Sequence, residues 1–318
     1  MLKLGAPQDI HGVLSVPKSV QRHIDINERQ QQRRRRLKRD KHAERATTDM
    51  VLDGCTKTLL SKLLNTGVLQ SLDSCISTGK EANVYHGKGS QGQHVAVKIY
   101  KTSVLSFRDR DRYVGGDWRF RGGYCKSNAR KMVEKWAEKE MRNLKRLERN
   151  GVPAPTAFVL RKHVLVMDFV GDGTQAAPRL ADADMSESRW RDAYVQTIRC
   201  MRTLFRHCRL VHGDLSEYNM LYHEKQVVFI DVSQSVDHEH PRAREFLVMD
   251  CVNVTHFFQR KGVVPMTVFE LFEFVSSENI TDDMVDDYLR EMRSIVSDRI
   301  ANKVTLDAVP FPHSDRSV

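Results

Sequence analysis

The sequence lacks the features that mark membrane-spanning, secreted and metal-ribbon proteins. No apolar run approaches the roughly 18 residues that a helix needs to cross a bilayer. Residues 1–18 also lack the continuous apolar stretch of a signal peptide. The six cysteines include no CxxC pair, so the sequence indicates neither a zinc ribbon nor a disulfide framework. We therefore expect a soluble intracellular protein with reduced thiols and no membrane partner.

Glycine and proline are scarce as well, with 17 and 9 residues in a chain of 318. No internal repeat and no flexible linker between domains is visible. A hydrophobic content of 40% is sufficient for a core and excludes a wholly disordered chain. We expect ordered structure from about residue 47 onward, after a tail over residues 1–46.

The net charge of +10 is concentrated in two segments. Residues 1–50 hold 12 Lys and Arg against 6 Asp and Glu, and nine of these basic residues fall within residues 29–45. Such a run predicts a disordered tail that binds a polyanion such as RNA, with a nuclear-import signal or a solubilising tail as the alternative. Residues 107–131 hold eight basic and three acidic residues among aromatic ones, which suits single-stranded RNA. The alternative for this second segment is a loop whose aromatic residues cover the neighbouring lobe.

The first half of the ordered chain predicts a small α+β lobe, to which we assign residues 47–170. Apolar residues at helical spacing predict short helices over residues 51–69 and one main helix over residues 131–149. The expected strands lie at residues 75–87 (two strands around Gly79), 94–100 and 157–171 (a hairpin). Five antiparallel strands with a helix inserted after the third give an α+β architecture.

The second half, residues 171–318, is predicted to be a mostly helical lobe. Asp184 and Glu187 have the spacing of a capping box, ahead of an amphipathic helix that ends near Cys208. Two short strands are expected at residues 210–211 and 227–231, and further helices at residues 244–258, 266–275 and 282–296.

Three polar residues beside these short strands have the spacing of a phosphotransfer site. Asp214 and Asn219 lie five residues apart after the first strand, and Asp231 ends the second. The first carboxylate can accept a hydroxyl proton, while the amide and the second carboxylate can hold Mg²⁺. A D-x4-N pattern followed by a strand that ends in Asp is the spacing of the protein-kinase catalytic and metal loops.

A lysine and a glutamate upstream complete this pattern. Lys98 lies in AVKIY on the third predicted strand, where kinases place the lysine that contacts ATP phosphates. Such a lysine needs a helix glutamate, and both Glu138 and Glu140 are candidates. Glu140 lies seven residues after Val133 and therefore shares the apolar face of the helix. We predict Glu140 as the partner of Lys98 and place Glu138 on the solvent face.

These motifs together resemble the RIO-type atypical serine/threonine protein kinases, most of all their first subfamily, although the third shares much of the pattern. The resemblance covers about residues 47–293. The matching segments are STGKEANVY (77–85), RFRGGYCKSNARKMVEKWAEKEMRNL (119–144), VLVMDFVG (164–171), LVHGDLSEYNMLY (210–222) and IDVSQSVDHEHPRAREFL (230–247). The resemblance implies a two-lobed protein-kinase-like fold. Gly213 departs from the family, which usually has Ala between the His and the Asp.

The resemblance also implies a role for each matching residue. Asp214 would be the proton acceptor or active-site acid, Asn219 and Asp231 would hold Mg²⁺, and Lys98 with Glu140 would bind the phosphates of ATP. Asp231 would in addition accept phosphate in an ATPase cycle. Met167 would gate the adenine pocket, beside the backbone of Asp168 and Val170. The phosphate-binding loop would consist of Ser77, Thr78, Gly79, Lys80, Glu81, Ala82, Asn83 and Val84.

The segment after Asp231 is too short for an activation loop, because only nine residues separate it from Pro241. The usual peptide-docking platform is therefore missing. This favours slow autophosphorylation on Ser or Thr, or ATP hydrolysis as a conformational switch. The resemblance implies a role in late maturation of the small (40S) ribosomal subunit in the cytoplasm, with the pre-40S particle and its RNA bound through the basic tail and loop. Shuttling through the nucleus and the oligomeric state stay open.

Two alternative functions fit parts of the pattern. A small-molecule phosphotransferase of the aminoglycoside or choline kinase type also has HGDLxxxN followed by a strand and Asp, but STGKEANVY and the basic insert weigh against it. A catalytically idle RNA-binding scaffold would fit the basic segments. The intact set of Lys98, Asp214, Asn219 and Asp231 weighs against the scaffold.

Overall fold

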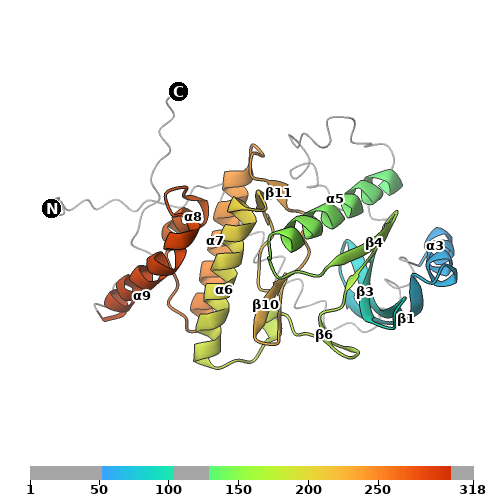
Figure 1. Ribbon diagram of the computed structural model, residues 1–318, viewed down its shortest axis with the longest axis horizontal. Helices are drawn as coiled ribbons and strands as arrows, with labels where there is room; N and C mark the ends of the chain where they lie inside the picture. Colours follow the sequence, from blue (N-terminus) through green and yellow to red (C-terminus); the bar gives the residue numbers. More distant parts are fainter. Residues whose placement is uncertain (1–51, 103–128, 302–318) are drawn as a thin grey trace. The chain divides into compact units, whose positions relative to one another are not determined.

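A computed structural model describes residues 52–102 and 129–301 of the chain. The first lobe contains a five-stranded antiparallel sheet with the strand order β1-β2-β3-β5-β4 (Figure 1). Its strands are β1 (Leu69–Thr78), β2 (Ala82–Gly89), β3 (His94–Tyr100), β4 (Ala157–Arg161) and β5 (Val164–Asp168). The prediction of five strands with a helix after the third is confirmed. The first strand begins earlier than predicted, at Leu69.

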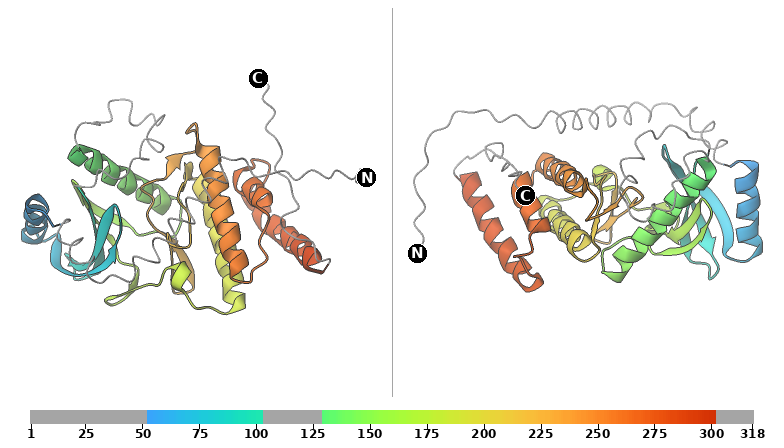
Figure 2. Two further views of the ribbon diagram at one scale, coloured as in Figure 1. Left: turned by 180° about the vertical axis from the view of Figure 1, so that it is seen from behind. Right: turned by 90° about the horizontal axis from the view of Figure 1, so that it is seen from above.

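Helices cover both faces of this sheet. Helix α3 (Gly54–Asn65) lies on one side and α5 (Ala129–Arg149) on the other, as the view from above shows (Figure 2). The side chain of Asp53 caps α3 by accepting a hydrogen bond from the backbone N–H of Thr56 at 2.7 Å. Because side chains alternate along a strand, Val95, Val97 and Ile99 of β3 pack in the α3 core, whereas Ala96 and Tyr100 pack in the α5 core. Lys98 therefore lies on the α5 face, between Ala96 and Tyr100.

Helix α5 packs through the stripe that its apolar spacing predicts. Five of its apolar residues are almost completely buried, namely Val133, Trp136, Ala137, Leu144 and Leu147. Glu140 lies on the same stripe and is only 1% exposed. The helix begins two residues earlier than predicted and ends where predicted, at Arg149.

The second lobe is mostly helical, as predicted. Its longer helices are α6 (Glu187–Arg206), α7 (Ala243–Arg260), α8 (Val268–Ser276) and α9 (Val285–Ala301). Its short elements are β6 (Gly171–Asp172), β7 (Gln175–Ala176), η2 (Leu180–Asp182), β8 (Leu210–Val211), β9 (Met220–His223), β10 (Gln226–Phe229), β11 (Val236–Asp237) and η3 (Asp282–Met284). Between Asp231 and α7 the described chain contains only the two-residue strand β11, which leaves no activation loop there.

Two sequence predictions in this lobe are wrong. The capping box at Asp184 and Glu187 does not form, because α6 begins at Glu187 and the side chain of Ser186 accepts the hydrogen bond from the N–H of Arg189. The strand β9 was not predicted. It has only four residues, of which Met220 alone is buried, and its pairing with β10 defines it.

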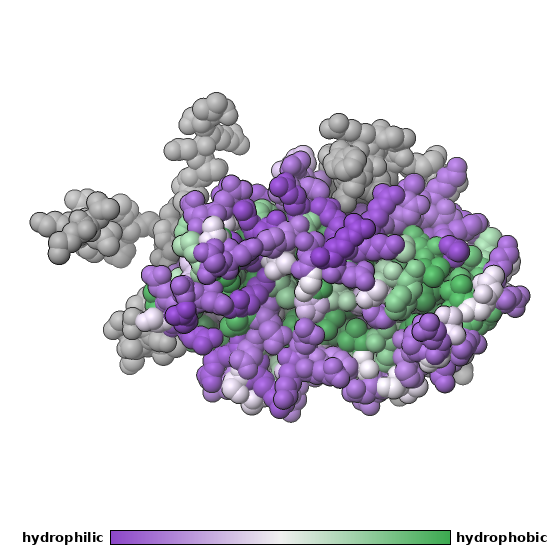
Figure 3. Space-filling model, viewed as in Figure 1, coloured by the Kyte–Doolittle hydropathy of each residue, from purple (hydrophilic) through white to green (hydrophobic). Residues whose placement is uncertain are grey.

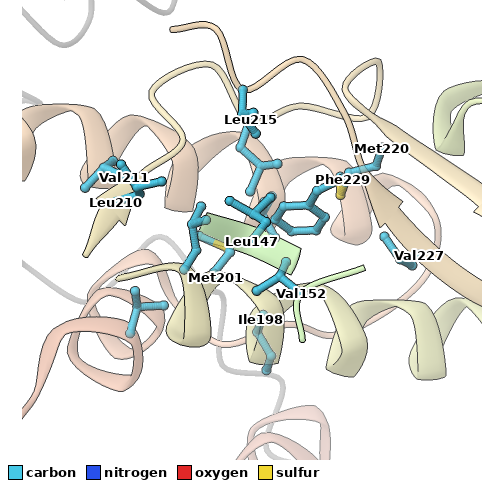
Figure 4. Packing of buried hydrophobic residues seen from close by; sticks show 14 of the residues in the cluster. Leu147, Val152, Ile198, Met201, Leu210, Val211, Leu215, Met220, Val227 and Phe229 are labelled. Atoms are coloured by element: carbon cyan, nitrogen blue, oxygen red, sulfur yellow. The ribbon is translucent and has the colours of Figure 1, made fainter. Parts of the chain in front are cut away.

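Buried residues connect the two lobes around the predicted catalytic loop. Leu147 of α5 and Val152 lie beside Ile198 and Met201 of α6 and beside Phe229 of β10 (Figure 4). The loop itself is flanked by three buried residues, Val211, Leu215 and Met220. The loop is therefore anchored on both sides by core packing.

On the face seen in Figure 3, the surface is mainly hydrophilic over the helical lobe, whereas hydrophobic residues gather over the five-stranded sheet. Within residues 52–102 and 129–301, no helix combines the length and apolar character needed to cross a membrane. The predicted basic tail over residues 1–46 and most of the predicted basic loop over residues 107–131 lie outside the described residues.

Candidate active site

A lysine held between two carboxylates forms the centre of the site. The Nζ atom of Lys98 donates to Oε1 of Glu140 at 2.7 Å and to Oδ1 of Asp231 at 2.9 Å. Tyr100, two residues along β3, donates its hydroxyl to the other oxygen of Glu140. Along the chain, Glu140 and Asp231 are 42 and 133 residues away from Lys98. The fold thus brings together three residues that the sequence spacing singled out.

The structure also shows which of the two candidate glutamates is the partner of Lys98. Glu140 is buried against Lys98. Glu138 lies at the surface, where it pairs with Lys135 at 2.9 Å and with Arg142 at 3.7 Å. Helical periodicity therefore distinguishes the partner of Lys98 from a surface charge two residues away.

Burial and neighbouring opposite charges shift the pKa values of Lys98, Glu140 and Asp231 in opposite directions. Burial alone would lower the pKa of Lys98, but Asp231 and Glu140 outweigh it and raise that pKa above its usual value. Burial would raise the pKa of Asp231, but Lys98 holds it below its usual value. Burial raises the pKa of Glu140 to about 7 in spite of the attraction of Lys98. One ammonium group therefore serves two carboxylates, and an additional cation is favoured at this position.

Asp231 has an unusual backbone conformation directly after strand β10. Its φ angle is 61°, which is rare for a residue other than glycine. Oδ1 accepts a second hydrogen bond, from the Ser233 hydroxyl at 3.0 Å. Asn143 of α5 holds the next residue by donating to the carbonyl of Val232 at 2.9 Å. These contacts fix the direction of the carboxylate and bind the loop to α5.

The hairpin of β9 and β10 places Asn219 next to Asp231. Met220 pairs with Phe229, and the N–H of Ile230 donates to the carbonyl of Asn219 at 3.0 Å. The side-chain amide of Asn219 donates through Nδ2 to the carbonyl of Asp214 at 2.7 Å and to its Oδ2 atom at 3.3 Å. The amide oxygen is the atom that Asn219 offers to a cation. The spacing of Asp214, Asn219 and Asp231 thus corresponds to one compact arrangement.

Asp250 of α7 holds the catalytic loop, and sequence reasoning missed it. Its carboxylate accepts from the N–H of Gly213 at 2.9 Å and from the N–H of Leu215 at 2.8 Å, on either side of Asp214. Asn253, one turn later, donates to the carbonyl of Leu215 at 3.0 Å. Burial raises the pKa of Asp250 to about 7, although both N–H groups oppose this shift. The sequence signal that could have revealed Asp250 is the position of an Asp on the buried face of the apolar helix predicted over residues 244–258.

Gly213 and His212 complete the support of the loop. The φ angle of Gly213 is 78°, in the left-handed region that favours glycine, which gives this departure from the family pattern a physical reason. Burial lowers the pKa of His212 to about 4, so the ring is neutral at pH 7. Its Nε2 atom lies 3.2 Å from the carbonyl of Ile230, to which it can donate. The residues before Asp214 are therefore tied to the segment that carries Asp231.

The predicted phosphate-binding residues lie around the turn between β1 and β2. Ser77 and Thr78 end β1, Ala82, Asn83 and Val84 begin β2, and Gly79, Lys80 and Glu81 form the turn. The N–H of Gly79 donates to the carbonyl of Ala82 at 2.9 Å and closes the turn. Arg179 reaches this strand from the second lobe and donates to the Ser77 hydroxyl at 3.1 Å. The turn thus lies at the boundary between the lobes.

The predicted hinge follows strand β5. Met167 is buried and pairs with Ala96 of β3. The N–H of Asp168 donates to the carbonyl of Thr156 at 2.9 Å, and the carbonyl of Val170 accepts from Ala177 at 3.0 Å. The N–H of Asp168 and the carbonyl of Val170 are therefore already paired within the protein.

Within the described ranges, no group of three or more His, Cys, Asp or Glu residues has the geometry of a metal site. Mg²⁺ retains waters and takes only one or two protein carboxylates beside substrate phosphates. Asn219 and Asp231 supply the oxygen ligands that such an ion prefers.

Comparison with known proteins gives one consistent group of relatives. A family model described as the RIO domain matches residues 83–271, which is more than half of the chain. The protein named serine/threonine-protein kinase rio1 from Dictyostelium discoideum is 54% identical over 256 residues, covering 80% of this chain and 45% of the relative. The protein named serine/threonine-protein kinase RIO1 from Homo sapiens is 51% identical over 286 residues, covering 90% of this chain and 50% of the relative. The chain thus spans about half the length of these curated relatives.

Among solved structures, the Rio2 kinase–ADP/Mg²⁺–phosphoaspartate complex from Chaetomium thermophilum has a similar fold. The TM-score is 0.53 at 22% sequence identity, and the match covers 74% of this chain and 75% of that one. This similarity supports the two-lobed kinase-like fold.

Proposed function

This chain belongs to the RIO family of atypical kinases, and on that premise we propose that it is an ATP- and Mg²⁺-dependent serine/threonine protein kinase that also hydrolyses ATP. The observation that carries the proposal is the buried contact of Lys98 with both Glu140 and Asp231. A lysine paired with a helix glutamate, beside a metal-loop aspartate, is the arrangement that phosphoryl transfer from ATP requires.

The residues present fit both a nucleotide and Mg²⁺. Asp231 and Asn219 would hold the ion, which when bound neutralises charge on the phosphate oxygens. Lys98 would donate to the phosphates, while Glu140 and the hydroxyl of Tyr100 keep it in place. The turn between β1 and β2 would cover the phosphates, and Met167 would border the adenine site.

Asp214 would act on the proton of the attacking hydroxyl group. Asp250 and Asn219 support this role, because they fix the backbone and the side chain of Asp214 from two sides. We extend the proposal to Asp231 as a phospho-acceptor. The solved Rio2 structure named above contains a phosphoaspartate, as its description states. In this chain, Lys98 and Ser233 both contact Oδ1 of Asp231, so Oδ2 is the oxygen that would receive the phosphoryl group.

The substrate proposal rests on the short connection between Asp231 and α7. A general peptide kinase needs a segment there that supports its peptide, and the described chain has only β11. We therefore propose Ser or Thr residues of the chain itself as acceptors, or hydrolysis of ATP as a conformational switch.

The proposed setting is late maturation of the small (40S) ribosomal subunit in the cytoplasm. The family resemblance of the motifs supports this proposal, together with the positive charge of residues 1–50 and 107–131, which would bind RNA of the pre-40S particle. Shuttling through the nucleus is part of the same proposal, since basic runs also serve nuclear import.

A labelling experiment tests the activity. The purified chain would be incubated with Mg²⁺ and γ-labelled ATP beside Asp214→Ala and Asp231→Asn, and the label measured in free phosphate, in protein and in added small alcohols. Label in phosphate or protein that is lost in both variants is the expected result. Transfer to a small alcohol would instead indicate a small-molecule phosphotransferase. The absence of any Asp214-dependent turnover would contradict the proposed site and favour an RNA-binding scaffold.

A further inference from the structure

The turn that would cover the phosphates is short and needs support from outside. Gly79 and Ala82 close it through one backbone hydrogen bond of 2.9 Å, with Lys80 and Glu81 at its tip. Within the described part of the chain, the N–H group of Lys80 donates to no backbone carbonyl. Backbone N–H groups in this position are suitable donors for phosphate oxygens. Their use depends on how firmly the turn is held.

Lys101, the residue after strand β3, holds this turn from inside the lobe. Its backbone N–H donates to the carbonyl of Glu81 at 2.8 Å, and its Nζ atom donates to the carbonyl of Gly79 at 2.7 Å. Lys101 is 4% exposed, whereas Lys80 at the tip of the turn is exposed. Lys101 thus contacts both sides of the turn, at Gly79 and at Glu81.

Burial of the Lys101 ammonium group costs free energy, and filling the space does not require a charged side chain. Moving a charged amine out of water is unfavourable unless a partner compensates, and burial lowers the pKa of Lys101. A methionine of similar length would fill the same space without that cost. Nζ donates to a carbonyl oxygen of the phosphate-binding turn, so the charge acts on the turn.

A second contact holds the turn from helix α5. The indole N–H of Trp136 donates to Oε2 of Glu81 at 3.2 Å, and Trp136 is 1% exposed. Trp136 lies one helical turn before Glu140, which holds Lys98. The turn is therefore fixed by two buried side chains, one from the end of β3 and one from α5.

We propose that Lys101 is a positioning residue for the phosphate-binding turn: it orients the carbonyl of Gly79 and thereby sets the turn for the phosphates of the nucleotide. The inference rests on the proposed function. Lys101 would act through Gly79 rather than by contact with the nucleotide. Its loss should therefore affect ligands that carry phosphates and spare ligands that do not.

Calorimetric binding of ADP with Mg²⁺ and of adenosine to Lys101→Met would test this inference. A lost hydrogen bond from a charged donor is expected to weaken ADP binding about tenfold. Adenosine binding should stay unchanged, because the hinge is elsewhere. Lys88→Met, an exposed lysine on β2, is the matched control and should bind both ligands as the wild type does. Lys101→Arg, which keeps a charged donor, should recover part of the ADP affinity.

Equal weakening of ADP and adenosine would overturn the proposal, since it would indicate general damage to the lobe. Unchanged ADP binding would overturn it as well. Hydrogen exchange of the ligand-free protein provides a readout that needs no nucleotide. Amides of residues 79–83 should exchange faster in Lys101→Met, while those of β3 and β5 should not. If the wild type bound no nucleotide, the proposed function would fail, and exchange would still decide whether Lys101 holds the turn.

Discussion

The exchange of Glu140 for Gln separates the activity of this site from the stability of the fold. The variant keeps the volume of the side chain and an oxygen that can accept from Lys98, but it removes the negative charge. Lys98 keeps its charge in the variant, so the remaining hydrogen bond still has one charged partner and stays within the range of about 1.5–3 kcal/mol for such bonds. The expected loss in holding Lys98 is a difference within that range, about 1 kcal/mol, which corresponds to roughly a 5-fold fall in kcat/KM for ATP.

Stability should change in the opposite direction. Burial raises the pKa of Glu140 to about 7, so the folded protein binds this proton more tightly than the unfolded chain does. The wild type therefore loses stability as the pH rises from the ordinary range of a Glu toward 7. Glu140→Gln does not titrate, so its melting temperature relative to the wild type should rise between pH 5 and pH 8.

The assay compares ATP turnover and thermal melting of Glu140→Gln with those of Glu138→Gln. The control makes the same chemical change two residues away on the same helix, where Glu138 pairs only with surface residues among the described contacts. It should leave both quantities nearly unchanged. A parallel fall of activity and melting temperature in Glu140→Gln would refute the reasoning, because it would show that Glu140 acts mainly through folding. Unchanged kcat/KM would refute the role in holding Lys98.

Three further predictions concern the loops around the centre. Asp250→Ala leaves the buried N–H groups of Gly213 and Leu215 without their acceptor, so the free energy of unfolding should fall by about 3 kcal/mol in urea denaturation; an unchanged midpoint would contradict the assignment. Arg179→Met removes the hydrogen bond to the Ser77 hydroxyl across the lobe boundary. Calorimetry should then show a Kd for ADP that is roughly two- to tenfold higher. A lower Kd would instead show that this hydrogen bond competes with the nucleotide. Titration of Mg²⁺ should restore ATP turnover after chelation in the wild type but not in Asp231→Asn, and full recovery of that variant would exclude Asp231 as a ligand.

The sequence predicted those parts of the site that depend on regular spacing. The AVKIY motif placed Lys98 on the third strand, and helical spacing selected Glu140 from two candidates. Asp250 escaped prediction, because a buried carboxylate that binds backbone N–H groups has no partner side chain to recognise. The start of α6 was placed wrongly at Asp184 because Ser186 offers an equally good cap, and only the path of the chain decides between them. The contact of Lys101 with Gly79 depends on how a turn folds back, which spacing does not encode.

One stripe of helix α5 contacts four parts of the site in succession. Trp136 holds the phosphate turn, Glu140 holds Lys98, Asn143 holds the loop after Asp231, and Leu147 packs into the core beneath the catalytic loop. These residues lie three or four positions apart in the sequence, so they form a single line along one face of the helix. A displacement of α5 would disturb these contacts jointly rather than one by one. Substitutions along this line should therefore be strongly non-additive, because the first one that shifts the helix already removes part of what the others contribute. In evolutionary terms, the line is expected to change as a unit or not at all.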